Sequence, residues 1–164
     1  MGAHYKFYRL YYSIFALIGF TALIYFLLVL PSWRVFQVNY ITKIIGGAVT
    51  VFGGAAVFIC IWKYFFQLSG LKTLIEERKT NDLMITGIHK YVRHPLYSGT
   101  FLFIWGLWVL IPSTALLISN IIITVYTIIG ISFEEKKLVN EFGEAYEKYK
   151  REVPMIIPGL GGRG

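Results

Sequence analysis

Charged residues are scarce in this sequence, and those of negative sign are the scarcer. They make up 15% of the 164 residues, whereas 56% are hydrophobic. Soluble domains carry about 25% charged residues, so this composition excludes disorder and most soluble folds. Cysteine is almost absent: Cys60 stands alone in an apolar run. No intrachain disulfide can therefore form, and a structural zinc site is disfavoured.

Long uncharged runs dominate the chain instead. Two of them, 10–30 and 44–62, would each form a helix about 30 Å long, the thickness of one bilayer. A third run, 96–133, would reach roughly 57 Å as one helix and must fold back, with Pro112 and Ser113 as the only plausible turn. The predicted architecture is all-α and polytopic, with four transmembrane helices at 10–30, 44–62, 96–111 and 114–133, the last two forming a hairpin.

The basic residues predict an orientation in the membrane. Sixteen Lys and Arg against nine Asp and Glu give a net charge of +7. Two of the basic residues, Arg34 and Lys43, fall on one predicted face, and the other fourteen fall on the opposite face. The positive-inside rule then places both termini and the 63–95 segment in the cytoplasm. Topology and attraction to lipid headgroups explain the charge, so no nucleic-acid partner is expected.

Two further patterns concern helix packing. Gly46, Thr50 and Gly54 form a row of small residues that lets another helix approach closely. Beyond the fourth span the pattern becomes amphipathic, which predicts a C-terminal cytoplasmic helix that lies on the membrane or covers the bundle and ends before Pro154. Its apolar face comprises Leu138, Phe142, Tyr146, Tyr149 and Val153, spaced 4, 4, 3 and 4 residues apart.

Two polar clusters flank the predicted hairpin, one just before the third span and one just after the fourth. A tight hairpin brings both clusters to the cytoplasmic mouth of the same helix pair. Pro95 fits the first turn of a helix with His94 as its cap, and the free N–H groups there, together with Arg93, can hold a carboxylate or phosphate. Glu134 and Glu135 can hold a cation. A ligand with both a carboxylate and an ammonium group suits this arrangement.

Each of these residues also has a plainer interpretation. Arg93 can be a headgroup anchor and His94 a simple helix cap. Metal binding by the histidines and the acidic pair is a third interpretation, but His89 and His94 are five residues apart and match no metal motif. Two acidic residues at a basic boundary are the hardest to dismiss, because they oppose the local charge preference.

The same residues carry a resemblance to a known family. The block from Arg93 to Gly99, Arg-His-Pro-Leu-Tyr-Ser-Gly, followed after the hairpin by Glu134-Glu135, resembles the integral-membrane methyltransferases. These include isoprenylcysteine carboxyl methyltransferase and the phospholipid N-methyltransferases. The resemblance covers roughly 80–158, and the pairing of the two blocks is specific, although either block alone is weak.

The resemblance implies transfer of a methyl group from S-adenosylmethionine to a lipid or lipidated acceptor at the cytoplasmic membrane face. The chemistry of the two clusters makes Arg93, Glu134 and Glu135 the candidate catalytic residues, and no metal is expected. Cofactor contacts carried over from the family are Asn81, Asp82, Leu83, Met84, His89, His94, Pro95, Leu96, Tyr97 and Glu134. The chain would then be a single membrane domain, 1–164, with two spans in 1–66 and a cofactor-binding catalytic region in 67–158.

The sequence departs from the family at two positions and does not choose the acceptor. His89 stands where the family commonly has Tyr, and Gly130 stands where the isoprenylcysteine enzymes have an Arg that is implicated with the substrate carboxylate. An amine acceptor needs a base, for which Glu135 or His94 could serve. A carboxylate acceptor needs no base but would prefer a cation such as Arg93.

Two other functions compete with methyl transfer. A membrane reductase of the steroid or sterol type would share the location and a lipid substrate but would need a nicotinamide cofactor. The glycines at 159–164 form no dinucleotide fingerprint, because no helix follows them. In a non-enzymatic membrane module the small-residue row would bind a partner, and the polar clusters would be anchors.

Overall fold

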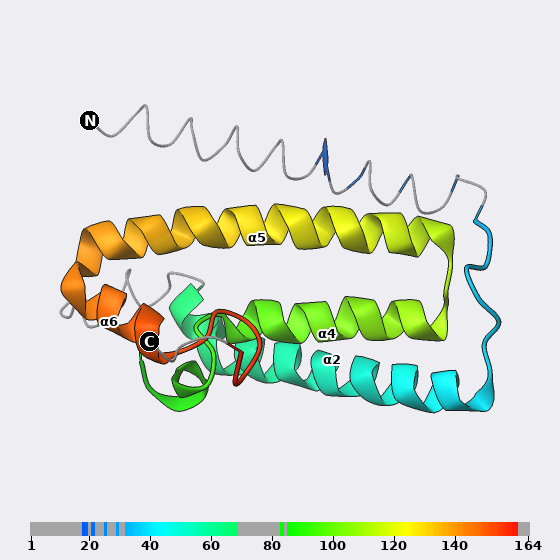
Figure 1. Cartoon of the computed structure of the whole chain (residues 1–164), viewed down its shortest axis with the longest axis horizontal. Coiled ribbons are helices and arrows are strands. Elements are labelled where there is room, and N and C mark those ends of the chain that lie inside the picture. Colours follow the sequence, from blue (N-terminus) through cyan, green and yellow to red (C-terminus); the bar gives the residue numbers. More distant parts are fainter. Residues whose placement is uncertain are drawn as a thin grey trace.

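A computed structural model describes residues 18, 19, 21, 25, 29, 32–68, 83 and 85–160. The regular elements of this part of the chain are helical: α2 (Tyr40–Leu68), the short 3-10 helix η1 (Gly87–Lys90), α4 (Pro95–Leu110), α5 (Thr114–Phe142) and α6 (Glu144–Glu152). Helix α2 lies alongside α4, and α4 and α5 form a hairpin whose turn lies at the opposite end of the bundle from α6 (Figure 1). The predicted first span, 10–30, lies mostly outside the described residues.

Two of these helices are long and apolar enough to cross a membrane, Tyr40–Lys63 and Thr114–Phe142. Helix α4, with 16 residues, is a shorter apolar helix. Large apolar side chains stand exposed on the outer surfaces of the long helices, among them Val51 and Phe52 on α2 and Ile122 on α5. Helices whose backbone groups bond internally and whose apolar side chains face outward suit a lipid environment. The four-span topology and its orientation stay predictions.

The predicted turn at Pro112 and Ser113 is confirmed. The Ser113 hydroxyl accepts a hydrogen bond from the Leu116 N–H at 3.2 Å and so caps α5. The segment before α2 is hydrogen-bonded to the turn. The Val35 N–H donates to Pro112 O, and the Thr114 N–H donates to the carbonyl oxygen of Trp33 in that segment. The hairpin is therefore held at its closed end by main-chain bonds.

Helix α2 and helix α4 approach so closely that glycines are required on both sides. A methyl group on Gly106 would lie 2.6 Å from the Thr50 nitrogen, and one on Gly53 would clash with the nitrogen of Phe103. Gly46 lies against Leu110 in the same way. The small-residue row on α2 was thus correctly predicted as a packing surface, with Gly53 in closer contact than Gly54.

The predicted helix beyond Phe133 is wrong in one respect, because it is not continuous. Helix α5 runs on to Phe142, and Gly143 then adopts a φ of +56°, a value that favours glycine, before α6 begins. The chain turns back there, and α6 ends at Glu152, ahead of Pro154. The residues of the predicted apolar face pack against one another across this turn. Tyr146, Tyr149 and Val153 form a buried cluster, and Leu83, Leu138, Val139 and Phe142 pack against it.

We expect Gly106→Ala to lower the free energy of unfolding by about 1–3 kcal/mol, because the added methyl group forces α2 and α4 apart. Gly47→Ala is the matched control, since a methyl group there meets nothing within 4 Å. Unfolding in detergent micelles followed by circular dichroism measures both. Equal stability of the two variants would show that the close contact contributes nothing.

Candidate active site

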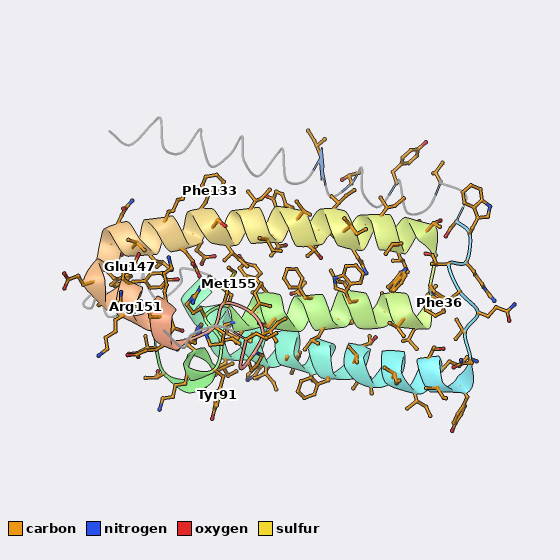
Figure 2. All side chains as sticks on the ribbon, viewed as in Figure 1. Phe36, Tyr91, Phe133, Glu147, Arg151 and Met155 are labelled. Atoms are coloured by element: carbon orange, nitrogen blue, oxygen red, sulfur yellow. The ribbon has the colours of Figure 1, made fainter. Side chains whose placement is uncertain are left out.

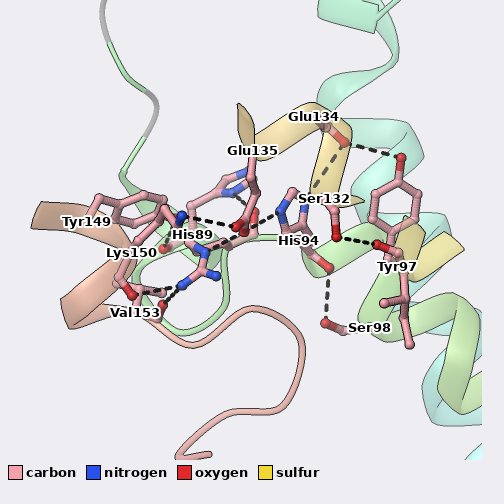
Figure 3. A network of polar contacts seen from close by, with 12 residues as sticks. His89, His94, Tyr97, Ser98, Ser132, Glu134, Glu135, Tyr149, Lys150 and Val153 are labelled. Atoms are coloured by element: carbon pink, nitrogen blue, oxygen red, sulfur yellow. Dashed lines mark hydrogen bonds and ion pairs between the residues drawn. The ribbon is translucent and has the colours of Figure 1, made fainter. Parts of the chain in front are cut away.

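The polar cluster lies where four segments meet: η1, the start of α4, the C-terminal half of α5 and the end of α6 (Figure 3). Pro95 occupies the first turn of α4, and His94 stands at the cap position, as predicted. The His94 side chain makes no capping bond. Its ring instead reaches across to α5, and this contact joins the two halves of the hairpin.

The centre of the cluster is the carboxylate of Glu135, which is 7% exposed. Arg93 Nε donates to its Oε1 at 2.8 Å, and His94 Nε2 lies 3.2 Å from the same oxygen. Lys150 Nζ lies 3.9 Å from Oε2. A buried carboxylate is costly unless it is paired and hydrogen-bonded, and these three groups supply that pairing.

Arg93 also holds the end of α6. Its terminal NH1 nitrogen donates to the carbonyls of Lys150 at 2.9 Å and Val153 at 2.5 Å. Free carbonyls at the C-terminus of a helix attract cations, so this contact stabilises α6. The Arg93 guanidinium thus has acceptors within the chain itself, and its binding of a cofactor carboxylate stays a prediction.

The chain beyond α6 returns to the start of α4. The Arg93 N–H donates to Pro154 O and the His94 N–H to Met155 O. One turn further along α4, the Ser98 hydroxyl donates to Ile156 O at 2.6 Å. The stretch from 154 to 156 therefore fixes the backbone on which Arg93 and His94 stand.

Glu134 forms the open side of the cluster. Its side chain is 48% exposed, unlike that of Glu135. The Tyr97 hydroxyl donates to Glu134 Oε2 at 3.5 Å, and His94 Nδ1 lies 4.0 Å from the same oxygen. Since a carboxylate only accepts, the bond to Glu135 places a hydrogen on His94 Nε2. In the neutral ring, Nδ1 then carries a lone pair on the side of Glu134 and Tyr97.

His89 and Tyr149 support the cluster from behind. The Tyr149 hydroxyl donates to His89 O at 2.6 Å, and His89 Nδ1 lies 3.2 Å from Arg93 O. Burial raises the pKa of Tyr149 to about 12, so its hydroxyl keeps its hydrogen at neutral pH. Burial also lowers the pKa of the His89 imidazole below 6.5, and the hydrogen bond to Arg93 only partly opposes this effect.

The structure gathers most of the predicted site residues and separates a few. Arg93, His94, Tyr97, Glu134 and Glu135 form one cluster, with His89 next to it. Leu96 is half-buried on α4, and Leu83 lies in the apolar cluster under α6. Asn81, Asp82 and Met84 lie outside the described residues. Within the described residues, no group of three or more His, Cys, Asp or Glu side chains could hold a metal ion.

The sequence did not indicate Lys150 or the carbonyls that accept from Arg93, and it gave Ser98 no role beyond its place in the Arg93–Gly99 block. Lys150 contacts the cluster because α6 folds back at Gly143. Tyr149 was predicted only as part of an apolar face, which is correct for its ring, but its hydroxyl also bonds to the main chain. Hydrogen bonds to backbone carbonyls leave no trace in residue identity, so no signal could have revealed them.

Comparison with known proteins defines the class. Residues 41–145 match the family described as phospholipid methyltransferase, and the chain belongs to this family. The methanethiol S-methyltransferase of Crocosphaera subtropica is 41% identical over 101 residues, which cover 58% of this chain and 39% of that protein. The protein-S-isoprenylcysteine O-methyltransferase of Schizosaccharomyces pombe is 30% identical over 110 residues, covering 62% and 47%. No solved structure gives a significant match.

The match extends beyond the region in which the sequence resembled the family, because it includes α2. The aligned regions span less than half the length of these relatives. Membership in a methyltransferase family favours methyl transfer over the reductase and the non-enzymatic module.

We expect Arg93→Gln to lower the free energy of unfolding by about 3–5 kcal/mol, because it leaves the buried Glu135 carboxylate without its main partner. The double variant with Glu135→Gln should lose less than the sum of the two single variants. Lys148→Gln is the control, because its ion pair with Glu152 is exposed and contributes at most about 0.5 kcal/mol. Denaturant unfolding in micelles measures all four, and a loss in Arg93→Gln no larger than in the control would contradict the assignment.

The lowered pKa of His89 makes stability depend on pH. The unfolded chain takes up this proton at a higher pH than the folded chain does. The free energy of unfolding therefore decreases as the pH falls below about 6.5. We expect His89→Gln, which keeps a donor for Arg93 O, to flatten the loss of stability between about pH 7 and pH 5. Unfolding curves at several pH values test this, and parallel pH profiles of variant and wild type would refute it.

Proposed function

We propose that the chain is an S-adenosylmethionine-dependent methyltransferase acting on a lipid or lipidated acceptor at the cytoplasmic membrane face. The observation that carries this proposal is the meeting of His94 and Tyr97, from the start of α4, with the acidic pair of α5. The family supports the reaction class. In this arrangement four helices cross the membrane, both termini are cytoplasmic, and residues 67–158 form the catalytic region.

The open side of the cluster fits the cationic part of the cofactor. Glu134, Tyr97 and His94 Nδ1 present acceptor atoms around one half-exposed carboxylate, and the Tyr97 ring adds an aromatic face. An ammonium or sulfonium group finds both a counter-charge and a polarizable surface there. When bound, S-adenosylmethionine supplies an electrophilic methyl group. The residues that would hold it are Glu134 and Tyr97, with His89 and residues 81–84 as further proposed contacts.

The two glutamates and Arg93 take different roles in this proposal. Glu135 already accepts from Arg93 and His94, so it is a poor base and serves to orient the His94 ring. Its charge would stabilise a protonated imidazole, much as a carboxylate supports histidine in hydrolases. His94 Nδ1 is then the base that removes a proton from the acceptor. Arg93 acts as a positioning residue, because its contacts hold Glu135 and α6.

The structure favours an acceptor that carries a removable proton, such as a thiol or an amine, over a carboxylate. Among the described residues, a methyl group on Gly130 would meet nothing within 4 Å, and Gly130 supplies no cation where the isoprenylcysteine enzymes have an Arg. Arg93 cannot replace that Arg, because it is engaged within the chain. The relative from Crocosphaera subtropica is named for a thiol acceptor.

The location supports a lipid-like acceptor. Helix α4 has 16 residues and spans only about 24 Å, less than the hydrocarbon core of a bilayer. Its start, with His94 and Tyr97, would therefore lie at or just below the headgroup layer. A water-soluble cofactor and a membrane-borne acceptor can meet at that depth.

We expect Glu134→Gln to weaken binding of S-adenosylhomocysteine, the cofactor product, by about 1.5–3 kcal/mol, roughly 10- to 150-fold, because a charge-assisted contact to the ammonium is lost. Glu141→Gln, an exposed acid two turns further along α5, is the matched control and should bind normally. Calorimetry on the purified full chain measures both, with NADPH titrated in parallel. Equal affinity of the two variants would show that the cofactor does not bind at Glu134. Binding of NADPH without binding of S-adenosylhomocysteine would favour the reductase over the methyltransferase.

A further inference from the structure

A second site lies at the end of the bundle that is remote from the polar cluster. Phe36 marks this end in Figure 2, whereas Glu147, Arg151 and Met155 lie at the other. A pocket of about 310 Å³ opens there between the segment before α2, the first turns of α2 and the α4–α5 turn. Its lining includes Arg34 and Lys43 together with residues 110–113. The volume lies at the lower end of the range for small-molecule pockets, about 300–1,000 Å³.

The two cations of this pocket are the only basic residues that the sequence places on this face. The charge count leaves Arg34 and Lys43 alone between the first two predicted spans, and 19 residues separate Lys43 from the next basic residue along the chain, Lys63. Both line the same pocket. Two cations that share one concave site on an otherwise uncharged face point to a binding function more than to topology.

Neither cation is neutralised by an acidic side chain of the described residues. In the described part of the protein, Arg34 and Lys43 form no ion pair, and the first turns of α2 and α5 contain no acidic residue. The N-termini of α2 and α5 and the C-terminus of α4 all meet at this end (Figure 1). Since two positive helix ends face one negative end, the backbone adds to the positive field of the side chains. Lys43 in particular lies near the positive end of its own helix, where a cation is disfavoured.

The surroundings place the pocket at the level of lipid headgroups. It lies at the start of α2, whose apolar span begins at Tyr40. Tyr40 and the nearby Trp33 are 78% and 69% exposed, as aromatic residues at membrane interfaces are. Val38, Leu110 and Ile111 add apolar lining to the pocket. A molecule with a phosphate group above an apolar body matches these features.

We infer that this pocket binds a phosphate group, held between Arg34 and Lys43 at the non-catalytic end of the bundle. Arg34 provides the planar fork that recognises phosphate, and Lys43 provides a second charge in the same pocket. The phosphate can belong to a phospholipid headgroup or be free in solution. The site does not depend on the proposed methyl transfer, since it shares no residue with the polar cluster.

Native mass spectrometry of the delipidated full chain in detergent tests the proposal. Three probes separate the sources: dioleoylphosphatidylglycerol, dioleoylglycerol without the phosphate, and inorganic phosphate. We expect one dioleoylphosphatidylglycerol per chain, and at least about tenfold weaker binding in Arg34→Gln/Lys43→Gln. Lys136→Gln/Lys137→Gln, which removes two exposed cations near the other end, is the matched control and should change affinity less than about twofold.

The outcomes are distinct. Binding of the phospholipid but not of dioleoylglycerol supports a lipid phosphate, and equally variant-sensitive binding of inorganic phosphate supports free phosphate as the source. Equal phospholipid affinity in wild type and Arg34→Gln/Lys43→Gln, or equal binding of dioleoylglycerol, would overturn the site. Arg34 and Lys43 are exposed, so both variants should keep the wild-type circular dichroism spectrum. If the double variant fails to fold, Lys43→Gln alone provides the same comparison.

Discussion

The buried carboxylate of Glu135 is the constraint from which the rest of the site follows. A charge with 7% exposure is tolerated only where partners replace the lost water, and here both main partners come from the two residues before α4. The end of α5 must therefore stay beside the start of α4. Arg93 has donors left after meeting Glu135, and these hold the carbonyls at the end of α6. One carboxylate thus joins the hairpin and the C-terminal segment.

Helix α2 serves the site without touching the carboxylate cluster. Gly46 and Gly53 on α2, and Gly99 and Gly106 on α4, are each seven residues apart, so the same stripe recurs every two turns on both helices. The close approach they allow fixes α4 along its length by dispersion contacts, which remain effective in lipid. A short helix such as α4 needs this support, because the position of His94 and Tyr97 depends on where it begins.

The sequence predicts this fold well where spacing carries the information. Arg93 and Glu135 stand at comparable distances on either side of Pro112, so a hairpin at that residue must bring them together, and it does. The break at Gly143 was missed because an apolar repeat of three and four residues fits one helix or two equally well. Which of Glu134 and Glu135 is buried was also not predicted. Neighbouring residues on a helix point about 100° apart, and only the position of α4 and α6 decides which one is buried.

Charged side chains are paired within the protein at one end of the bundle and are without a carboxylate partner among the described residues at the other. This contrast follows from what surrounds each end. At the site end, α6 and the chain after it cover the cluster, so Arg93, His94 and Glu135 must satisfy one another, and only Glu134 remains half exposed for exchange with a ligand. At the turn end the described chain supplies no carboxylate to Arg34 or Lys43. An exposed cation at a membrane surface costs little, because anionic lipid and water provide its partners. Charges that cancel within the protein fix its geometry, whereas charges left without a protein partner are those that can bind something else.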